Sequence, residues 1–326
     1  MTIHPIWEPY PEVKQDLTDV LEVIDANITL RDQKARKTIL DLLYAGGKLL
    51  RPAFFLLTAK AGERYDRDQF IHVAASVEVL HMASLIHDDI IDEAETRRGM
   101  PTVQSQFGQK YALYTGDYLF CVCFKILAKY ADALSTIEFN TDTVERILIG
   151  ELEQMESRYN TNITVKQYLR QISRKTAALF AMSCHIGAEL SGVDNYAKTN
   201  ARKIGHEIGM AFQILDDILD YTQDESAMRK PALEDVKQGV YSLPLIYAMN
   251  QNKEIFMPLL NKKECICEND IDKIIHLIKK SNGIEKAREL ATKYTNKAIA
   301  RINKLPDCES KAIMLELTEK LLRRQS

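Results

Sequence analysis

The stretch that decides the fold is ASLIHDDIID, residues 83–92, in which an apolar run ends in an Asp-Asp-x-x-Asp pattern. A second copy of this pattern ends the stretch AFQILDDILD, residues 211–220. On a helix, the first and last Asp of each copy are four positions apart and project from nearly the same face. Each copy therefore offers a pair of carboxylates to one point in space, at a place where a helix would otherwise face a core.

Carboxylates gathered in an apolar setting repel one another and lose hydration unless a cation compensates them. Magnesium suits such a place because it binds carboxylate oxygens, keeps several waters and takes phosphate oxygens as further ligands. The chain has 46 Asp and Glu among 326 residues, so a single copy would more often be a solvated helix end. Two copies in similar apolar settings favour a metal-dependent site.

The composition is that of a globular chain, with 46% hydrophobic residues and a net charge of -3. This charge provides no broad basic field, which argues against nucleic acid as a partner. The six cysteines show no paired zinc spacing, and no basic-then-apolar signal opens the chain. We therefore expect reduced thiols in the cytoplasm. Charged residues are expected to interrupt every apolar run before it reaches the length of a membrane span.

Only 13 Gly and 9 Pro, with helix-period apolar spacing almost throughout, predict an all-α protein without a convincing strand. Residues 114–133 and 177–190 are apolar on more than one side, as is typical of helices at the centre of a bundle. No linker is rich enough in Gly, Pro or Ser to divide the chain. We therefore expect residues 1–326 to form a single domain.

Basic residues accompany the acidic patterns and the glycine turns. Six of them form the set of interest: Lys48, Arg51, Arg97, Arg98, Lys175 and Lys230. Lys48 and Arg51 follow a glycine turn three positions apart, which predicts one helix face for both. Each cation by itself is more often a solvated surface charge. Together the six balance the six Asp, and two diphosphates of about -3 each would be matched by three magnesium ions.

These motifs resemble, in type and order, the trans-isoprenyl diphosphate synthases. Seven motifs carry the resemblance over nearly the whole chain, from Gly47-Lys48 and Arg51-Pro52 through His81 and both acidic patterns to Leu305-Pro306. The chain is most similar to the catalytic component of hexaprenyl and heptaprenyl diphosphate synthases. The resemblance implies the isoprenoid synthase fold, a helical bundle around a central cavity. It also implies head-to-tail condensation of isopentenyl diphosphate with an allylic diphosphate, farnesyl or geranylgeranyl, to an all-trans polyprenyl diphosphate with release of diphosphate.

The resemblance further implies roles for individual residues. The expected ligands of three magnesium ions are Asp88, Asp92, Asp216, Asp217 and Asp220, with Asp89 in support. The allylic diphosphate is expected to contact Arg97, Lys175 and Lys230. The residues expected to hold the diphosphate of isopentenyl diphosphate are Lys48, Arg51, His81 and Arg98. Thr176 and Gln213 are expected to face the forming carbocation. The released diphosphate is expected to take the proton, since no His-carboxylate pair is evident as a base.

Product length is predicted from the residues that precede Asp88. Ala83 and Ser84 are small where short-chain members of the family carry an aromatic plug, and Leu80 and Val77 lie deeper. An open tunnel predicts a hexaprenyl to octaprenyl product, with Leu80, Val77, Phe120 or Phe124 as its floor. The chain departs from the family pattern at Leu49, where Arg is usual.

Three alternatives compete with this interpretation. A terpene cyclase or head-to-head synthase would leave Lys48, Arg51 and His81 without a task. A non-catalytic partner subunit would be expected to lose its carboxylates, and a metal-buffering module would need a ligand loop that the sequence lacks. The sequence leaves open whether the protein is a homodimer or pairs with a small regulatory subunit. Membrane contact is expected only transiently, when the product is released.

Overall fold

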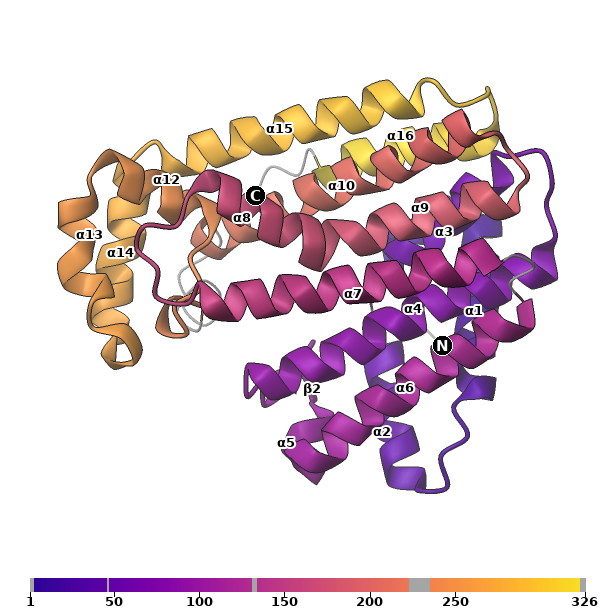
Figure 1. The fold of residues 1–326 in the computed structure, drawn as a ribbon, viewed down its shortest axis with the longest axis horizontal. Coiled ribbons are helices and arrows are strands. Elements are labelled where there is room, and N and C mark those ends of the chain that lie inside the picture. The colour runs from indigo at the N-terminus through magenta and orange to yellow at the C-terminus, as the bar shows by residue number, and fades with distance from the viewer. Residues whose placement is uncertain (1–2, 46, 131–133, 223–234, 323–326) are drawn as a thin grey trace. The chain divides into compact units, whose positions relative to one another are not determined.

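The computed structural model describes residues 3–45, 47–130, 134–222 and 235–322, with the backbone alone for residues 134–140. The described residues are helical almost throughout (Figure 1), which confirms the all-α prediction. The prediction of no strand was wrong at one hairpin, where Thr96–Arg97 (β1) pairs antiparallel with Met100–Pro101 (β2). Arg98 and Gly99 both have positive φ, of 52° and 76°. Such a two-residue turn matches the twist of the strands that it joins.

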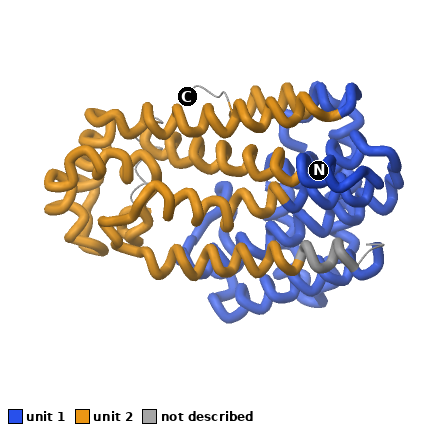
Figure 2. The backbone as a smooth tube through the Cα atoms, turned by 45° about the horizontal axis from the view of Figure 1, so that its top comes forward, with its two compact units in different colours: residues 1–140, 182–201, 306–313 blue, residues 141–181, 202–305, 314–326 orange. Residues whose placement is uncertain are grey.

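The chain divides into two compact units, each assembled from separate segments (Figure 2). Unit 1 comprises residues 1–140, 182–201 and 306–313, and unit 2 comprises residues 141–181, 202–305 and 314–326. The expected single domain over residues 1–326 stays a prediction.

Unit 1 is organised around its longest helix, α4 (Arg67–Ile91). The other helices that lie wholly in this unit are η1 (Pro5–Trp7), α1 (Pro11–Asn27), α2 (Gln33–Tyr44), α3 (Leu50–Lys60), α5 (Val103–Phe107) and α6 (Gln109–Tyr130). The side chain of Asp66 caps the start of α4 by accepting from the backbone N–H of Gln69. Apolar residues on every side of the middle of α4 are buried, so α4 is the core helix of unit 1.

Unit 2 has its own apolar core. The helices that lie wholly in this unit are α8 (Val165–Ile172), η2 (Ser173–Ala177), α12 (Leu243–Gln251), α13 (Lys253–Leu260), η3 (Lys263–Cys265), α14 (Glu268–Lys280) and α15 (Gly283–Ile302). Four more contribute residues to both units: α7 (Leu134–Glu156), α9 (Ala178–Leu190), α10 (Asn195–Thr222) and α16 (Glu309–Leu322). Buried side chains of α8, α10, α12, α14 and α15 form one hydrophobic cluster.

Two helices of unit 1 are long and apolar enough to span a membrane by length and composition, namely α4 and α6. Charged residues do interrupt both helices, at Glu78 in α4 and at Asp117 and Lys125 in α6, but they are too few to take either helix below the length and composition of a span. In α4, 72% of the most apolar window is buried inside the protein. This burial is typical of a core helix.

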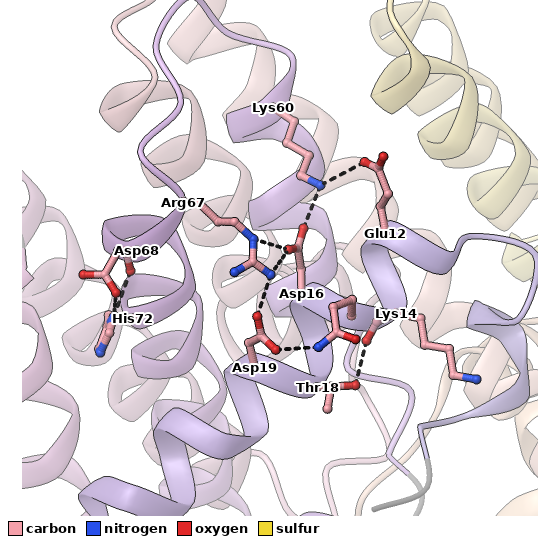
Figure 3. Close-up of polar contacts among 10 residues, drawn as sticks. Glu12, Lys14, Asp16, Thr18, Asp19, Lys60, Arg67, Asp68 and His72 are labelled. Atoms are coloured by element: carbon pink, nitrogen blue, oxygen red, sulfur yellow. Dashed lines mark hydrogen bonds and ion pairs between the residues drawn. The ribbon is translucent and has the colours of Figure 1, made fainter.

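An ion network joins α1 to α3 and α4 (Figure 3). The carboxylate of Asp16 is almost fully buried and lies 2.7 Å from Lys60 Nζ and 2.7 Å from Arg67 Nη2. Arg67 also contacts Asp19 at 2.5 Å. Two cations therefore compensate one buried carboxylate, and the N-terminal helix is tied to the core helix.

We expect Asp16→Asn to lower the free energy of unfolding by about 3 kcal/mol, because it leaves two cations without their shared buried carboxylate. Urea denaturation measures this change. Asp19→Asn is the matched control, since Asp19 is more exposed and contacts only one of the two cations. An equal loss in both variants would contradict the assignment of Asp16 as the centre of the network.

Candidate active site

The first acidic pattern occupies the end of α4. The helix ends at Ile91, and the backbone N–H of Asp92 donates to the carbonyl oxygen of Asp88 at 2.9 Å. The helical relation between Asp88 and Asp92 is thus kept through the last turn, as predicted. Asp88 is half-buried and Asp92 is exposed, so both carboxylates remain accessible to a ligand.

Asp89 differs from its two neighbours because it is 2% exposed. Its Oδ1 accepts from Arg97 Nε at 2.7 Å and lies 2.7 Å from Arg97 Nη2. Burial raises the pKa of Asp89, and the contact with Arg97 opposes that rise. Asp89 and Arg97 therefore form an internal pair that fixes the β1–β2 hairpin against the end of α4, in agreement with a supporting role for Asp89.

Three of the four residues predicted to hold one diphosphate meet in unit 1. Arg51 on α3 lies 3.0 Å from His81 on α4, measured from Nη1 to Nε2. The guanidinium of Arg98 packs against Gly47 so closely that a Cβ at this position would clash with it. A cavity of about 20 Å³ next to this cluster is lined by Glu78, Asp89 and Arg98 among others.

Arg51 and His81 are half-buried, Arg98 is exposed and the adjacent Glu78 is buried. Burial lowers the pKa of the Arg51 guanidinium to about 10. Burial raises the pKa of Glu78, and the charges of Arg51 and Arg98 oppose this rise. Burial, then Arg51, Arg98 and Arg97, lower the pKa of His81 well below 6.5. His81 is therefore a neutral hydrogen-bonding group among cations at neutral pH, and the cluster favours an anion.

Lys48 does not share a helix face with Arg51, so that prediction was wrong. Helix α3 begins only at Leu50, because Leu49 has a left-handed backbone with φ of 49°. The loop is instead held by Trp7, whose fully buried indole donates from Nε1 to the carbonyl oxygen of Lys48 at 2.7 Å. Sequence reasoning missed Trp7, and its only signal was that the chain contains a single Trp.

The second acidic pattern lies inside α10 in unit 2. Asp216 is exposed, Asp220 is half-buried and Asp217 is 8% exposed. Asp217 Oδ2 accepts from the hydroxyl of Tyr168 at 2.6 Å, and its Oδ1 accepts from Gln213 Nε2 at 2.9 Å. Again the middle Asp is buried and bonded to protein groups, while the outer two are more accessible.

Thr176 and Gln213 were both predicted to face the forming carbocation, and the structure links the two side chains directly. Thr176 Oγ1 donates to Gln213 Oε1 at 2.7 Å. Thr176 lies in η2, a π-helical stretch between α8 and α9. Single π-turns inside helices are frequent at functional sites. This stretch also carries Lys175, whose Nζ donates to Glu151 Oε2 at 2.9 Å and to Gln154 Oε1 at 3.1 Å.

A fourth carboxylate, that of Asp235, acts on Asp220 together with the other two Asp of the second pattern. Sequence reasoning missed it. Burial, followed by repulsion from Asp235, Asp217 and Asp216, raises the pKa of Asp220 to about 8. Asp235 lies outside the repeated pattern, and only folding brings it near α10. Lys230, predicted to hold the allylic diphosphate, lies outside the described residues.

A divalent cation fits the donor chemistry of both patterns, because each places accessible carboxylates beside buried ones that repel them. In the described part of the chain, no group of three or more His, Cys, Asp and Glu side chains could hold an ion by itself. The remaining ligands would therefore be oxygens of water or of a bound phosphate, which is usual for magnesium.

A His-carboxylate pair is present next to the first pattern, contrary to expectation. His87 Nε2 lies 3.3 Å from Asp117 Oδ1 on α6, and the ring stacks on Phe120 with centroids 5.4 Å apart. Gly116 leaves room for this ring, since a Cβ there would lie 2.5 Å from His87 Nε2. The residue before Asp88 is thus held by one face of α6.

The residues predicted to set product length lie on α4 in the interior of unit 1. Val77, Leu80 and Ala83 are buried. Ser84 is half-buried, and its hydroxyl donates to the carbonyl oxygen of His81 at 2.8 Å. Their role in product length stays a prediction.

Comparisons with known proteins identify the family of the chain. A family model described as polyprenyl synthetase matches residues 32–278. The chain is 35% identical over 309 residues to heptaprenyl diphosphate synthase component 2 of Geobacillus stearothermophilus, covering 94% of this chain and 95% of that protein. The solved geranylgeranyl pyrophosphate synthase from Lactobacillus brevis ATCC 367 superposes with a TM-score of 0.95 at 41% identity, covering 98% of this chain and 99% of that one. A polyprenyl synthase from Caulobacter crescentus CB15, solved with calcium and isoprenyl diphosphate, has a TM-score of 0.91 and 27% identity over 100% of both chains.

We expect the imidazole of His81 to remain neutral at about pH 6, because burial and the neighbouring guanidinium groups lower its pKa. The unfolded chain protonates this ring near its ordinary value, so the folded state loses stability as the pH falls through about 6.5. An NMR titration of the imidazole signals measures the ionisation, and a His81→Gln variant identifies the signal of His81. Protonation of His81 in the folded protein near its ordinary pKa would contradict this assignment.

Proposed function

The chain belongs to the polyprenyl synthetase family and is a trans-prenyltransferase, and we propose that it condenses isopentenyl diphosphate with an allylic diphosphate in a magnesium-dependent reaction. The observation that carries this proposal is the cluster of Arg51, His81 and Arg98. It provides an anion site that does not depend on the acidic patterns. A cyclase, which binds one diphosphate, has no use for such a second site.

The acidic patterns would hold the allylic diphosphate through metal ions. We assign Asp88, Asp92, Asp216 and Asp220 as the metal ligands, because they are the accessible members of the two patterns. Asp89 and Asp217 are buried, and we propose that they support these ligands from the interior. Three ions, as in the charge balance above, would neutralise two diphosphates. Bound magnesium would stabilise the negative charge that develops on the leaving diphosphate.

The remaining assignments concern the contacts of protein side chains with the two diphosphates and the carbocation, and the fate of the proton. Lys48, Arg51, His81 and Arg98 would bind the diphosphate of isopentenyl diphosphate. Arg97, Lys175 and Lys230 would contact the allylic diphosphate, and Thr176 and Gln213 would face the carbocation. We propose that the departing diphosphate accepts the proton lost after condensation. The contact with Asp117 orients the ring of His87. This contact accounts for the position of His87 without a role as the base.

Product and assembly are proposals that the relatives support in different ways. The Geobacillus relative is named as one component of a heptaprenyl synthase, which supports a heteromer with a small regulatory subunit, whereas a homodimer is the common form implied by the resemblance. The small residues at 83 and 84 support a hexaprenyl to octaprenyl product, made from farnesyl or geranylgeranyl diphosphate. We propose a cytoplasmic location, because all six cysteines lie in described segments as free thiols, with membrane contact at product release.

The direct test is to incubate the purified protein with magnesium, labelled isopentenyl diphosphate and farnesyl diphosphate, and to identify the product by mass. We expect a series of all-trans products that ends between hexaprenyl and octaprenyl. A geranylgeranyl product would contradict the predicted length, and no condensation with or without an added small subunit would contradict the proposed function.

We expect Arg51→Met to raise KM for isopentenyl diphosphate about tenfold or more, because a charged hydrogen bond to the diphosphate is lost. KM for the allylic substrate should change little. Steady-state kinetics with each substrate varied in turn measure this division. Arg301→Met is the matched control, since it removes a partly buried guanidinium that contacts Glu207 in unit 2. A rise confined to the allylic KM would reverse the assignment of the two diphosphates.

We expect Ala83→Phe to shorten the product, because an aromatic ring at this buried position would close the tunnel after few additions. Ser84→Phe tests the adjacent, half-buried position with less strain on the core. Product length is measured by extraction and mass analysis, and thermal melting shows whether each variant folds. Unchanged product length in both folded variants would refute the plug argument.

A further inference from the structure

Tyr168 on α8 has no role in the assignments above, yet its hydroxyl makes a short hydrogen bond to the second acidic pattern. The side chain is 4% exposed, and its hydroxyl donates to Asp217 Oδ2 at 2.6 Å. A hydrogen bond from a buried hydroxyl to a carboxylate is among the stronger kinds in proteins. The sequence provides no sign of this pair, because 49 positions separate the two residues.

Asp217 accepts hydrogen bonds from the side chains of two residues and from the backbone of Leu243. Oδ2 accepts from Tyr168, and Oδ1 accepts from Gln213 Nε2. Burial raises the pKa of Asp217 to about 6, while the hydrogen bonds from Tyr168 and Gln213 oppose this rise. These donors therefore make a buried carboxylate tolerable at a position that would otherwise suit an apolar residue.

The segment from α8 through η2 contacts α10 at two points one helical turn apart. Tyr168 binds Asp217, and Thr176 donates to Gln213 Oε1. Because Thr176 occupies the carbonyl oxygen of the Gln213 side chain, the amide nitrogen is directed toward Asp217. The rotation of α10 about its axis is thus set from both positions.

We propose that Tyr168 is a positioning residue of the reaction: by holding Asp217 in the interior, it fixes the rotation of α10 that keeps Asp216 and Asp220 accessible. Asp216 and Asp220 are four positions apart and share one helix face, and Asp217 lies about 100° from Asp216. A carboxylate that is tied inward therefore keeps its two neighbours on the accessible side. This inference rests on the proposed function for its kinetic consequence.

The matched pair of variants is Tyr168→Phe and Tyr221→Phe. Tyr221 lies on α10 itself, is 2% exposed, and has its hydroxyl 2.7 Å from Ser242 Oγ. Both substitutions remove one buried hydroxyl that makes a hydrogen bond inside unit 2. Only the hydroxyl of Tyr168 binds a carboxylate of the acidic pattern, so a general loss of packing should affect the two variants alike.

We expect Tyr168→Phe to raise the magnesium concentration for half-maximal rate and KM for the allylic substrate about fivefold to tenfold. KM for isopentenyl diphosphate should change less than about twofold, because its assigned ligands are in unit 1 and do not contact Tyr168. Tyr221→Phe should leave all three values within about twofold of the wild type. Equal kinetic effects of both variants would overturn the inference.

A binding measurement separates this inference from the proposed function. Calorimetry with magnesium and inorganic diphosphate requires no turnover. Weaker binding in Tyr168→Phe alone supports the positioning role even if the wild-type protein makes no polyprenyl product, whereas unchanged binding overturns it. Combining Tyr168→Phe with Asp217→Asn provides a further check. The double variant should bind magnesium and diphosphate no more weakly than Asp217→Asn alone, and fully additive losses would show that Tyr168 does not act through Asp217.

Discussion

The cost of burying a carboxylate is the constraint on which both acidic patterns depend. In each pattern the middle Asp is in the interior and is bonded by protein donors: Asp89 by Arg97, and Asp217 by Tyr168 and Gln213. An ionised carboxylate without such partners would lose several kcal/mol of solvation. The buried Asp thus anchors the end of its helix, and the outer two carboxylates are left for a ligand. One residue pattern therefore combines a structural task with the proposed binding of a ligand.

The two buried Asp residues are bonded by different kinds of donor, so they differ in the charge that they leave near their neighbours. Arg97 brings a positive charge to Asp89, so the pair is neutral and adds little to the local field. Tyr168 and Gln213 are neutral, so Asp217 keeps its negative charge close to Asp216, Asp220 and Asp235. Repulsion within the second pattern is therefore less compensated, and repulsion from Asp235, Asp217 and Asp216 adds to burial in raising the pKa of Asp220. A divalent cation would relieve more repulsion there than at the first pattern.

Helix α4 carries most of the candidate site residues of unit 1. Glu78 and His81 near its middle interact with Arg51 and Arg98, and the acidic pattern occupies its end. A site on a packed helix is held more precisely than one on a loop. The loop that carries Lys48 receives its order from elsewhere, namely from the indole of Trp7. Unit 1 thus combines one rigid scaffold with one loop that depends on an interaction 41 residues away.

The sequence alone determined the helical class and the two acidic patterns, because helical periodicity and residue type are local properties. The roles of Arg51, His81 and Arg98 were predicted from the family resemblance, and the structure brings the three side chains together. Tertiary structure alone decided which partner each buried group receives. Asp235 near Asp220, His87 against Asp117, Trp7 on the Lys48 loop and Tyr168 on Asp217 all join segments that are distant in the chain. The left-handed backbone at Leu49, which removed Lys48 from the helix, also belongs to this group. Hydrogen bonds and desolvation depend on which side chains packing brings within a few ångströms, and no local pattern contains that information.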